Sequence, residues 1–212
     1  MFTKKILSVV FLLLLLVPPV YAQEQNLSAP PLFFREDWKE IPAETPVTQE
    51  HVLTSGLVLG LHGPGKEMIK KSHHDAPVDD PYYIWSGQCE GTWAVTLEKR
   101  GSLVDLTRGR IRWRTKNYDR ILRVVVGLES GGWLVSSLGT GETPVWHEFT
   151  VDITGLAWRK LNTDSVTAGE TVEKPDLSRV RIVGFTDLET GGQSAACTRL
   201  DWFEVYGRNV KP

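Results

Sequence analysis

The chain has 212 residues, with 24 lysines and arginines against 26 aspartates and glutamates, which gives a formal net charge of −2. A near-neutral chain lacks the concentrated basic surface that nucleic-acid binding requires, so we expect no nucleic-acid partner. The length is sufficient for one well-filled hydrophobic core.

The N-terminus has the pattern of a secretory signal peptide. Lys4 and Lys5 precede an almost wholly apolar run over residues 6–17, and a small-residue pattern ends at Ala22. The apolar run is shorter than the roughly 20 residues that a membrane span needs. We therefore expect a signal peptide over residues 1–22, cleavage after Ala22, a secreted or periplasmic protein, and no membrane span after cleavage. Residues 23–31 are predicted to be a mobile leader.

The rest of the chain predicts a single domain over residues 32–208, with a short tail at 209–212. Segments rich in β-branched and aromatic residues alternate with glycine-containing turns, and none keeps a helical period. Many short strands at this spacing predict an all-β protein, an antiparallel sandwich or barrel. The strands are expected at residues 53–62, 82–86, 92–97, 110–115, 121–129, 133–138, 145–152, 157–161, 180–185 and 198–206.

The closing strands resemble those of a known superfamily. Val183-Gly184-Phe185-Thr186-Asp187 and Leu200-Asp201-Trp202-Phe203-Glu204-Val205 look like the final strands of galactose-binding-like jelly rolls, and Phe34-Arg35-Glu36-Asp37-Trp38 lies where such domains open. That superfamily includes many carbohydrate-binding modules and the complex I intermediate-associated type of domain. The resemblance implies an antiparallel jelly-roll β-sandwich, and it implies the fold rather than an activity.

The same resemblance implies a structural calcium site. In such modules, acidic residues of the first and last strands often bind a calcium ion, which takes carboxylate and carbonyl oxygens as ligands. Glu36, Asp37 and Asp201 are the matching residues if the opening and closing strands pair. The alternative is that they are ordinary edge charges or turn acceptors.

A row of arginines is the first candidate ligand site. Arg110, Arg112 and Arg114 alternate with apolar residues, so they share one face of a strand, and Arg123 follows on the next expected strand. Guanidinium groups match the geometry of carboxylates and sulfates, so the row is suited to an acidic glycan. The alternative is a solvated face with cross-strand ion pairs to Asp105, Glu129 or Glu148.

Eight tryptophans suggest a second kind of carbohydrate contact, because sugar rings stack on exposed aromatic faces. Trp146 lies on the polar face of its strand and Trp133 follows a Gly-Gly turn, so these two are the expected stacking platforms. Trp93, Trp113 and Trp202 alternate with polar neighbours and are expected in the core.

The connection between residues 63 and 81 is long for a compact domain, and such loops often carry function. His73, His74 and Asp75 are acid–base or metal-ligand candidates if the protein is an enzyme. Adjacent histidines are expected to point to opposite sides, and a solvated loop is the alternative. Cys89 and Cys197 form a disulfide in one interpretation and are two separate buried thiols in the other.

No nucleophile elbow, phosphate loop or dinucleotide motif is present. The pattern therefore favours a non-catalytic carbohydrate-binding β-sandwich, with an acidic glycan as the suggested ligand. One alternative is a glycan lyase or hydrolase on a jelly-roll scaffold. The other is a structural or assembly domain that contacts a protein partner.

Overall fold

The computed structural model describes residues 29–140, 142–191 and 195–212. The predicted signal peptide and residues 23–28 of the predicted leader lie outside these ranges. Within them, helical structure is limited to three short 3-10 turns, η1 (Gln49–His51), η2 (Lys66–Met68) and η3 (Ile153–Gly155). No helix in the described ranges is long and apolar enough to cross a membrane.

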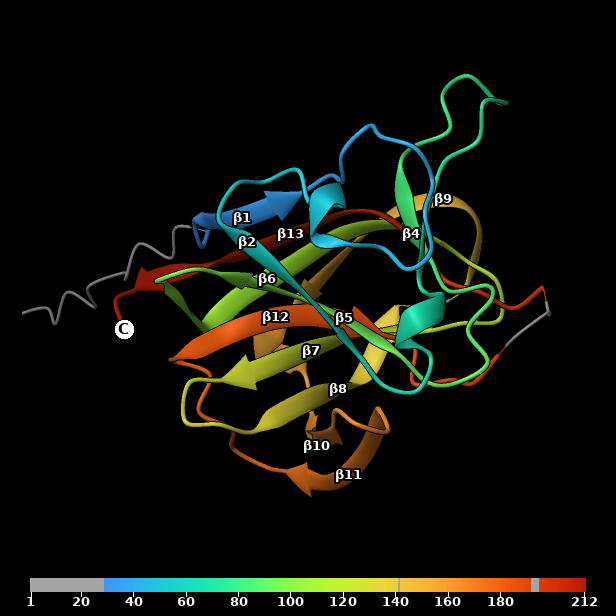
Figure 1. Cartoon of the computed structure of the whole chain (residues 1–212). Helices are drawn as coiled ribbons and strands as arrows, with labels where there is room; N and C mark the ends of the chain where they lie inside the picture. The colour runs from blue at the N-terminus through green and yellow to red at the C-terminus, as the bar shows by residue number, and fades with distance from the viewer. Residues whose placement is uncertain (1–28, 141, 192–194) are drawn as a thin grey trace, which may run out of the picture.

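Thirteen antiparallel strands form two layers (Figure 1). The first sheet has the order β2-β5-β12-β7-β8-β10-β11, and the second has β9-β6-β13, with β1 and β4-β3 beyond β13. The first sheet consists of β2 (Leu57–His62), β5 (Ala94–Lys99), β7 (Leu122–Leu128), β8 (Trp133–Thr140), β10 (Trp158–Asn162), β11 (Thr167–Val172) and β12 (Val180–Thr186). The second consists of β1 (Leu32–Glu36), β3 (Lys70–Ser72), β4 (Tyr83–Trp85), β6 (Leu103–Asn117), β9 (Thr143–Asp152) and β13 (Arg199–Val210).

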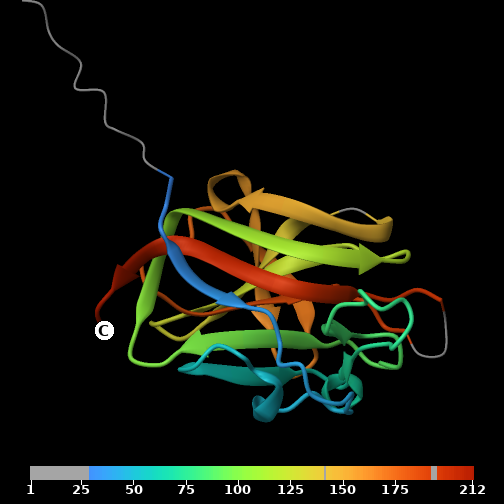
Figure 2. The same cartoon turned by 90° about the horizontal axis from the view of Figure 1, so that it is seen from above.

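The chain crosses repeatedly between the layers, and Figure 2 shows β9, β6, β13 and β1 side by side above β5 and β2. A single bridge between Val180 of β12 and Val104 of β6 joins the two sheets at one corner. The predicted all-β antiparallel jelly-roll sandwich is confirmed. The opening and closing strands also pair as expected, with Glu36 opposite Phe203.

The core lies between the layers and is centred on aromatic side chains. Phe203 of β13 is fully buried, and its ring centroid lies 5.6 Å from that of Phe185, 6.0 Å from that of Trp113 and 6.0 Å from that of Phe34. These contacts join β13 to β12, β6 and β1. Aromatic pairs at such distances add packing energy beyond the area that they bury. Trp93 and Trp113 are in the core, as predicted.

A second, smaller cluster covers part of the outer face of the first sheet. The β10–β11 hairpin places Leu161 and Val166 against Val125 and Val135. Trp133 lies at the edge of this cluster, half-buried, with its ring centroid 5.0 Å from that of His62. This face of the first sheet is therefore partly closed by the protein's own hairpin.

The residue pattern predicted ten of the thirteen strands and shortened some of them. Of the other three, β1 was expected only from the resemblance of residues 34–38 to an opening strand. β3 and β11 were not expected, because β3 has only three residues and β11, which has no run of apolar residues, pairs through its backbone at an exposed edge. β6 begins at Leu103 rather than Arg110 because it continues its pairing with β13. β13 ends at Val210, so the first two residues assigned to the tail belong to the strand.

Both cysteines are free and buried, so the disulfide interpretation is not supported and the alternative of two buried thiols holds. Their segments are neighbours, because the Ser86 N–H donates to the Thr198 carbonyl at 3.1 Å. Burial and the nearby Asp187 carboxylate raise the pKa of Cys89 to about 12. The Cys89 thiol is therefore held in its unreactive, protonated form.

Asp187 itself is a buried carboxylate at the end of β12. It is 2% exposed, and its oxygens accept hydrogen bonds from the Glu189 N–H at 3.0 Å and the Thr198 hydroxyl at 3.2 Å. Burial raises its pKa from 3.8 to about 6, against the opposing effect of these hydrogen bonds and of the Arg120 charge.

This raised pKa predicts a specific pH dependence of stability. The unfolded chain releases the Asp187 proton near pH 4 and the folded protein near pH 6, so the stability that the protonated form contributes is lost as pH rises through that window. We expect the free energy of unfolding of the wild type to fall by about 3 kcal/mol between pH 4 and pH 7 because of Asp187. Asp187→Asn is expected to abolish this fall. Urea unfolding at several pH values measures it, with the exposed Asp75→Asn as control. Equal slopes in the wild type and Asp187→Asn would contradict the prediction.

Candidate functional site

The outer face of the second sheet carries a row of basic side chains on β6. Ile111 and Trp113 are fully buried in the core, whereas Arg110, Arg112 and Arg114 are partly exposed on the opposite side. Successive side chains of a strand point to opposite faces, and the alternation expected here is confirmed.

Each arginine of this row is paired with a carboxylate on a neighbouring strand. Nε of Arg110 donates to Asp152 of β9 at 2.9 Å. Arg112 bridges two strands, donating to Glu148 of β9 at 3.0 Å and to Glu204 of β13 at 3.1 Å. The charges on this part of the row are therefore compensated within the protein.

A β-bulge in β13 supplies the partner of the third arginine. The register with β6 shifts between Leu200 and Trp202, and Leu200 and Phe203 both point into the core. Asp201 thus turns outward and accepts a hydrogen bond from Arg114 at 2.6 Å. Burial raises the pKa of Asp201, and the hydrogen bond from Arg114 opposes that shift. Bulges commonly re-aim side chains in this way.

The arginine row therefore has the cross-strand ion pairs of the alternative interpretation, rather than the free guanidinium groups of an anion-binding surface. Glu148 is a confirmed partner. Asp105 and Glu129, the other partners considered, pair instead with Arg208 and Arg179 elsewhere on the protein.

Arg123 does not extend the row. β7 pairs with β12 and β8 in the first sheet and not with β6, so Arg123 belongs to the other layer. Its guanidinium donates to the backbone carbonyl of Ser137. Adjacency along the chain did not mean adjacency in the sheet, because the chain crosses between layers after β6.

The three proposed calcium ligands do not all lie together. Glu36 is fully buried and accepts backbone hydrogen bonds from Trp38 at 3.0 Å, Leu53 at 2.6 Å and Thr54 at 2.9 Å. Asp37 is paired with Arg35 at 2.6 Å, and Asp201 with Arg114. Asp37 and Asp201 both line one groove, described below, whereas Glu36 is turned to backbone N–H groups, so the three carboxylates do not form one ligand set. Among the described residues, no group of three histidine, cysteine or acidic side chains is placed to hold a metal.

The loop after β3 folds back over the outer face of the second sheet. Asp80 Oδ2 accepts hydrogen bonds from the His74 backbone N–H at 2.8 Å and from its ring Nδ1 at 2.9 Å. The Tyr83 hydroxyl lies 3.0 Å from the same Nδ1. His73 points the other way and stacks on Tyr82, with ring centroids 4.0 Å apart. The two histidines therefore face opposite sides, as expected.

On one side of this loop lies a groove of about 930 Å³, called here the loop groove. Five carboxylates and two guanidinium groups line it, so its charge is predominantly negative. These charged groups belong to Asp37, Glu40, Asp79, Asp80, Asp201, Arg35 and Arg114. The remaining lining includes His73, Tyr82 and Trp202.

On the other side lies a pocket of about 270 Å³, called here the aromatic pocket. Its lining consists of His74, Ala76, Pro77, Asp80, Tyr83, Lys116, Tyr118, Trp146 and Arg199. Asp80 lines both this pocket and the loop groove. Arg114 connects them as well, because it lines the loop groove while its guanidinium lies 5.3 Å from the centroid of the Trp146 ring.

Trp146 is the better placed of the two predicted stacking platforms. It is half-buried, and its ring meets the edge of Tyr83 with centroids 5.4 Å apart. Trp133 lies on the first sheet, outside both pockets. Trp202 is on the outer face but only 6% exposed, because Arg35 and Arg112 lie 4.5 Å and 5.5 Å from its ring centroid.

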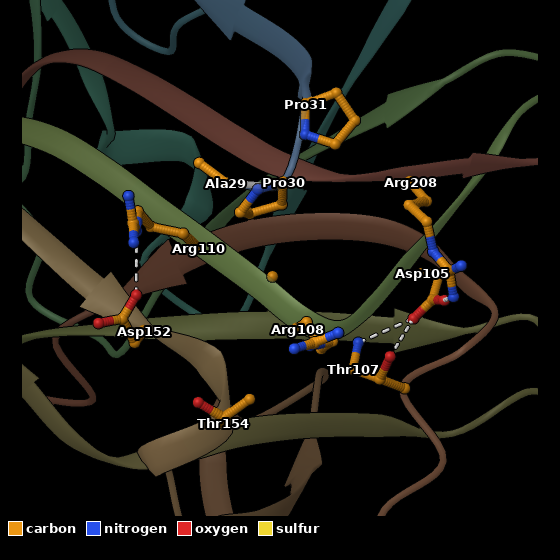
Figure 3. Close-up of a pocket in the computed structure, with 11 residues that line it drawn as sticks. Ala29, Pro30, Pro31, Asp105, Thr107, Arg108, Arg110, Asp152, Thr154 and Arg208 are labelled. Atoms are coloured by element: carbon orange, nitrogen blue, oxygen red, sulfur yellow. Dashed lines mark hydrogen bonds and ion pairs between the residues drawn. The ribbon is translucent and has the colours of Figure 1, made fainter. Parts of the chain in front are cut away.

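A third pocket, of about 460 Å³, lies at the far end of the arginine row, beside Pro30 and Pro31 (Figure 3). Arg110 points to Asp152 there, and Asp105 receives hydrogen bonds from Thr107. No aromatic side chain lines this pocket, so it has no surface for stacking a sugar ring.

The sequence pattern indicates His73, His74 and Asp75 as candidates in the loop but does not distinguish Asp80, Tyr82 or Tyr83. The structure brings His74 to Asp80 and Tyr83, whereas Asp75 is exposed and lines neither pocket. The acidic pair at residues 79–80 was the available signal, since a histidine and an acid six residues apart can meet across a tight loop.

The position of Glu36 predicts a loss of stability that does not depend on metal. Glu36→Gln places an amide N–H₂ against backbone N–H groups, so we expect destabilisation by about 1–3 kcal/mol. Asp37→Asn, at a partly exposed ion pair, is the control and changes stability less. Thermal unfolding with added calcium or with EDTA is expected to give the same curves for the wild type. A calcium-dependent rise in melting temperature that both variants lose would contradict this account.

Comparison with known proteins gives distant structural similarities only. No protein-family model and no curated protein sequence matches the chain. A family 11 carbohydrate-binding module from Clostridium thermocellum, solved with a β-1,3-1,4-mixed-linked tetrasaccharide, superposes with a TM-score of 0.45 at 10% identity, covering 80% of this chain and 98% of that one.

Two further structures are similar at the same level or lower. An exo-β-agarase superposes with a TM-score of 0.44 at 9% identity, covering 75% of this chain and 24% of that one. A carbohydrate-binding module of lichenase 5A from Cellvibrio mixtus, solved with cellotriose, has a TM-score of 0.32 at 11% identity, covering 79% and 98%. Carbohydrate-binding modules are thus among the structures that this chain resembles, at similarities too low to assign it to a family.

Proposed function

We propose that this protein binds carbohydrate on the outer face of its second sheet, where the loop groove and the aromatic pocket adjoin. The observation that carries the proposal is Trp146, a half-buried tryptophan supported by Tyr83 and Arg114 and bordered by polar side chains. A ring held in this way presents apolar area to a sugar at little cost in conformational entropy.

The polar lining supplies the second element of sugar recognition. Carboxylates and guanidinium groups accept and donate hydrogen bonds to hydroxyl groups, and those of Asp37, Arg35, Asp201 and Arg114 are already held in place by one another. A preorganised polar surface loses little freedom when a ligand binds. The predominantly negative loop groove favours neutral sugar residues there.

The N-terminal pattern supports export of the protein. The charged, apolar and small-residue regions ending at Ala22 are those of a cleaved signal peptide, and a secreted or periplasmic protein would meet polysaccharides. We include export in the proposal on that basis.

A second candidate function, glycan cleavage, is favoured by one contact. A lone pair on Nδ1 of His74 would be repelled by the Asp80 oxygen 2.9 Å away, so Nδ1 carries a proton and Nε2 is the nitrogen left to act as a base. His74 is well exposed, with 61% of its side chain accessible. Incubation of any bound glycan, followed by measurement of new reducing ends or unsaturated products, separates an enzyme from a binding module.

The proposal predicts that Trp146→Ala weakens glycan binding by about tenfold or more, because central aromatic anchors commonly contribute at least that much. A glycan array identifies the ligand, and titration calorimetry measures the affinity of each variant. Thermal unfolding verifies that each variant is folded.

Trp133→Ala is the matched control, since Trp133 is also half-buried but lies on the first sheet. It is expected to bind glycans as the wild type does. Loss of binding in Trp133→Ala with retention in Trp146→Ala would move the site to the first sheet. Absence of binding to every glycan would favour the alternative of an assembly domain with a protein partner.

A further inference from the structure

The basic row on β6 has a fourth member that differs from the other three. Lys116 follows Arg110, Arg112 and Arg114 at the same two-residue spacing, so it lies on the same outer face. The three arginines each have a carboxylate partner. The side chain of Lys116 has neither an ion pair nor a hydrogen bond to any residue that the structure describes.

A second cation without a carboxylate lies beside it. Arg199 of β13 donates from Nη1 to the Cys197 sulfur at 3.0 Å, and its guanidinium lies 5.5 Å from the Tyr118 ring centroid and 6.0 Å from that of Trp85. Within residues 29–140, 142–191 and 195–212, no acidic side chain pairs with it. Two aromatic rings and the sulfur atom thus hold the guanidinium group of Arg199 in position, while no carboxylate compensates its charge.

Lys116 and Arg199 both line the aromatic pocket. The pocket's one carboxylate, Asp80, is engaged by the backbone N–H and the ring of His74. The local charge of the aromatic pocket is therefore positive, whereas that of the adjoining loop groove is negative. An anion entering this face is attracted to one pocket and repelled by the other.

The other side chains of the aromatic pocket indicate which kind of molecule bears the anionic group. Trp146 forms part of the same pocket, so a ligand bound there has an apolar face to stack as well as a charge to pair. The volume of about 270 Å³ is at the small end of ligand pockets, which suits one sugar unit of a longer chain.

We infer that the aromatic pocket binds a sugar unit bearing an anionic group, a carboxylate or a sulfate, with Lys116 and Arg199 as its charge partners. The inference rests on the proposed function, because it assigns the ligand class of one part of the same site. It also moves the acidic-glycan interaction from the paired arginine row to the two unpaired cations at its end.

The test compares polysaccharides that have the same sugar backbone, with and without the anionic group. Polygalacturonate is paired with its fully methyl-esterified, neutral form, and a sulfated galactan with its desulfated form. Binding of the full-length protein is measured by titration calorimetry at low ionic strength. Lys116→Met and Arg199→Met remove the two charges, and Arg108→Met is the matched control.

Arg108 is a suitable control position because it is an exposed cation without a partner among the described residues. It lines the pocket that has no aromatic side chain. We expect the wild type and Arg108→Met to bind at least one anionic form about tenfold more tightly than its neutral counterpart. Lys116→Met and Arg199→Met are each expected to lose most of this preference while retaining affinity for the neutral form. A preference within the polygalacturonate pair would identify a carboxylate as the anionic group, and a preference within the galactan pair would identify a sulfate.

Three results would overturn the inference: equal affinity of the wild type for charged and neutral forms, a preference that survives in both pocket variants, or a preference that Arg108→Met abolishes. Binding of neutral glycans without any charge preference would reject this inference and leave the proposed function standing. Failure to bind any glycan would reject both. Because Lys116 makes no contact that the fold requires, its variant remains informative if Arg199→Met is unstable.

Discussion

The pairing of β13 with β6 is the contact on which the rest of the structure depends. On the inner side it places Phe203 beside Trp113, at the centre of the core. On the outer side it places Glu204 within reach of Arg112. β13 also pairs with β1 and β4 along its other edge, so the same strand positions both ends of the domain and the base of the loop groove.

The bulge in β13 connects this pairing to the candidate site. Without the register shift, Asp201 and Trp202 would point to opposite faces of the sheet. With it, Asp201 neutralises Arg114, which then stacks beside Trp146. Partly exposed ion pairs of this kind contribute about 0–1 kcal/mol each to stability. Their larger consequence is positional, because they hold side chains in place. Lys116 and Arg199, on the same face, have no carboxylate partner among the residues that the structure describes.

Local pattern predicted much of the fold and part of the site. Strand alternation placed Trp113 inside and Arg112 outside, and adjacent histidines were expected to diverge. The closing strands were recognised from their apolar residues. β3 and β11 show the limit of this approach, since β11 has no run of apolar residues and β3 is too short to form a pattern. Both are held by backbone pairing with neighbours that hydrophobic periodicity does not reveal.

By itself, the sequence determined which side chains share a face, because the period of a strand is a local property of the backbone. It therefore determined the arginine row and the burial of Trp113 on the opposite face of the same strand. Only the tertiary structure decided the partner of each charge, because that depends on the register among β9, β6 and β13 and on one bulge. It assigned Arg123 to the other sheet, turned Glu36 to three backbone N–H groups, and brought Asp80 to His74. Those choices depend on contacts between segments far apart in the chain, and they define the candidate site.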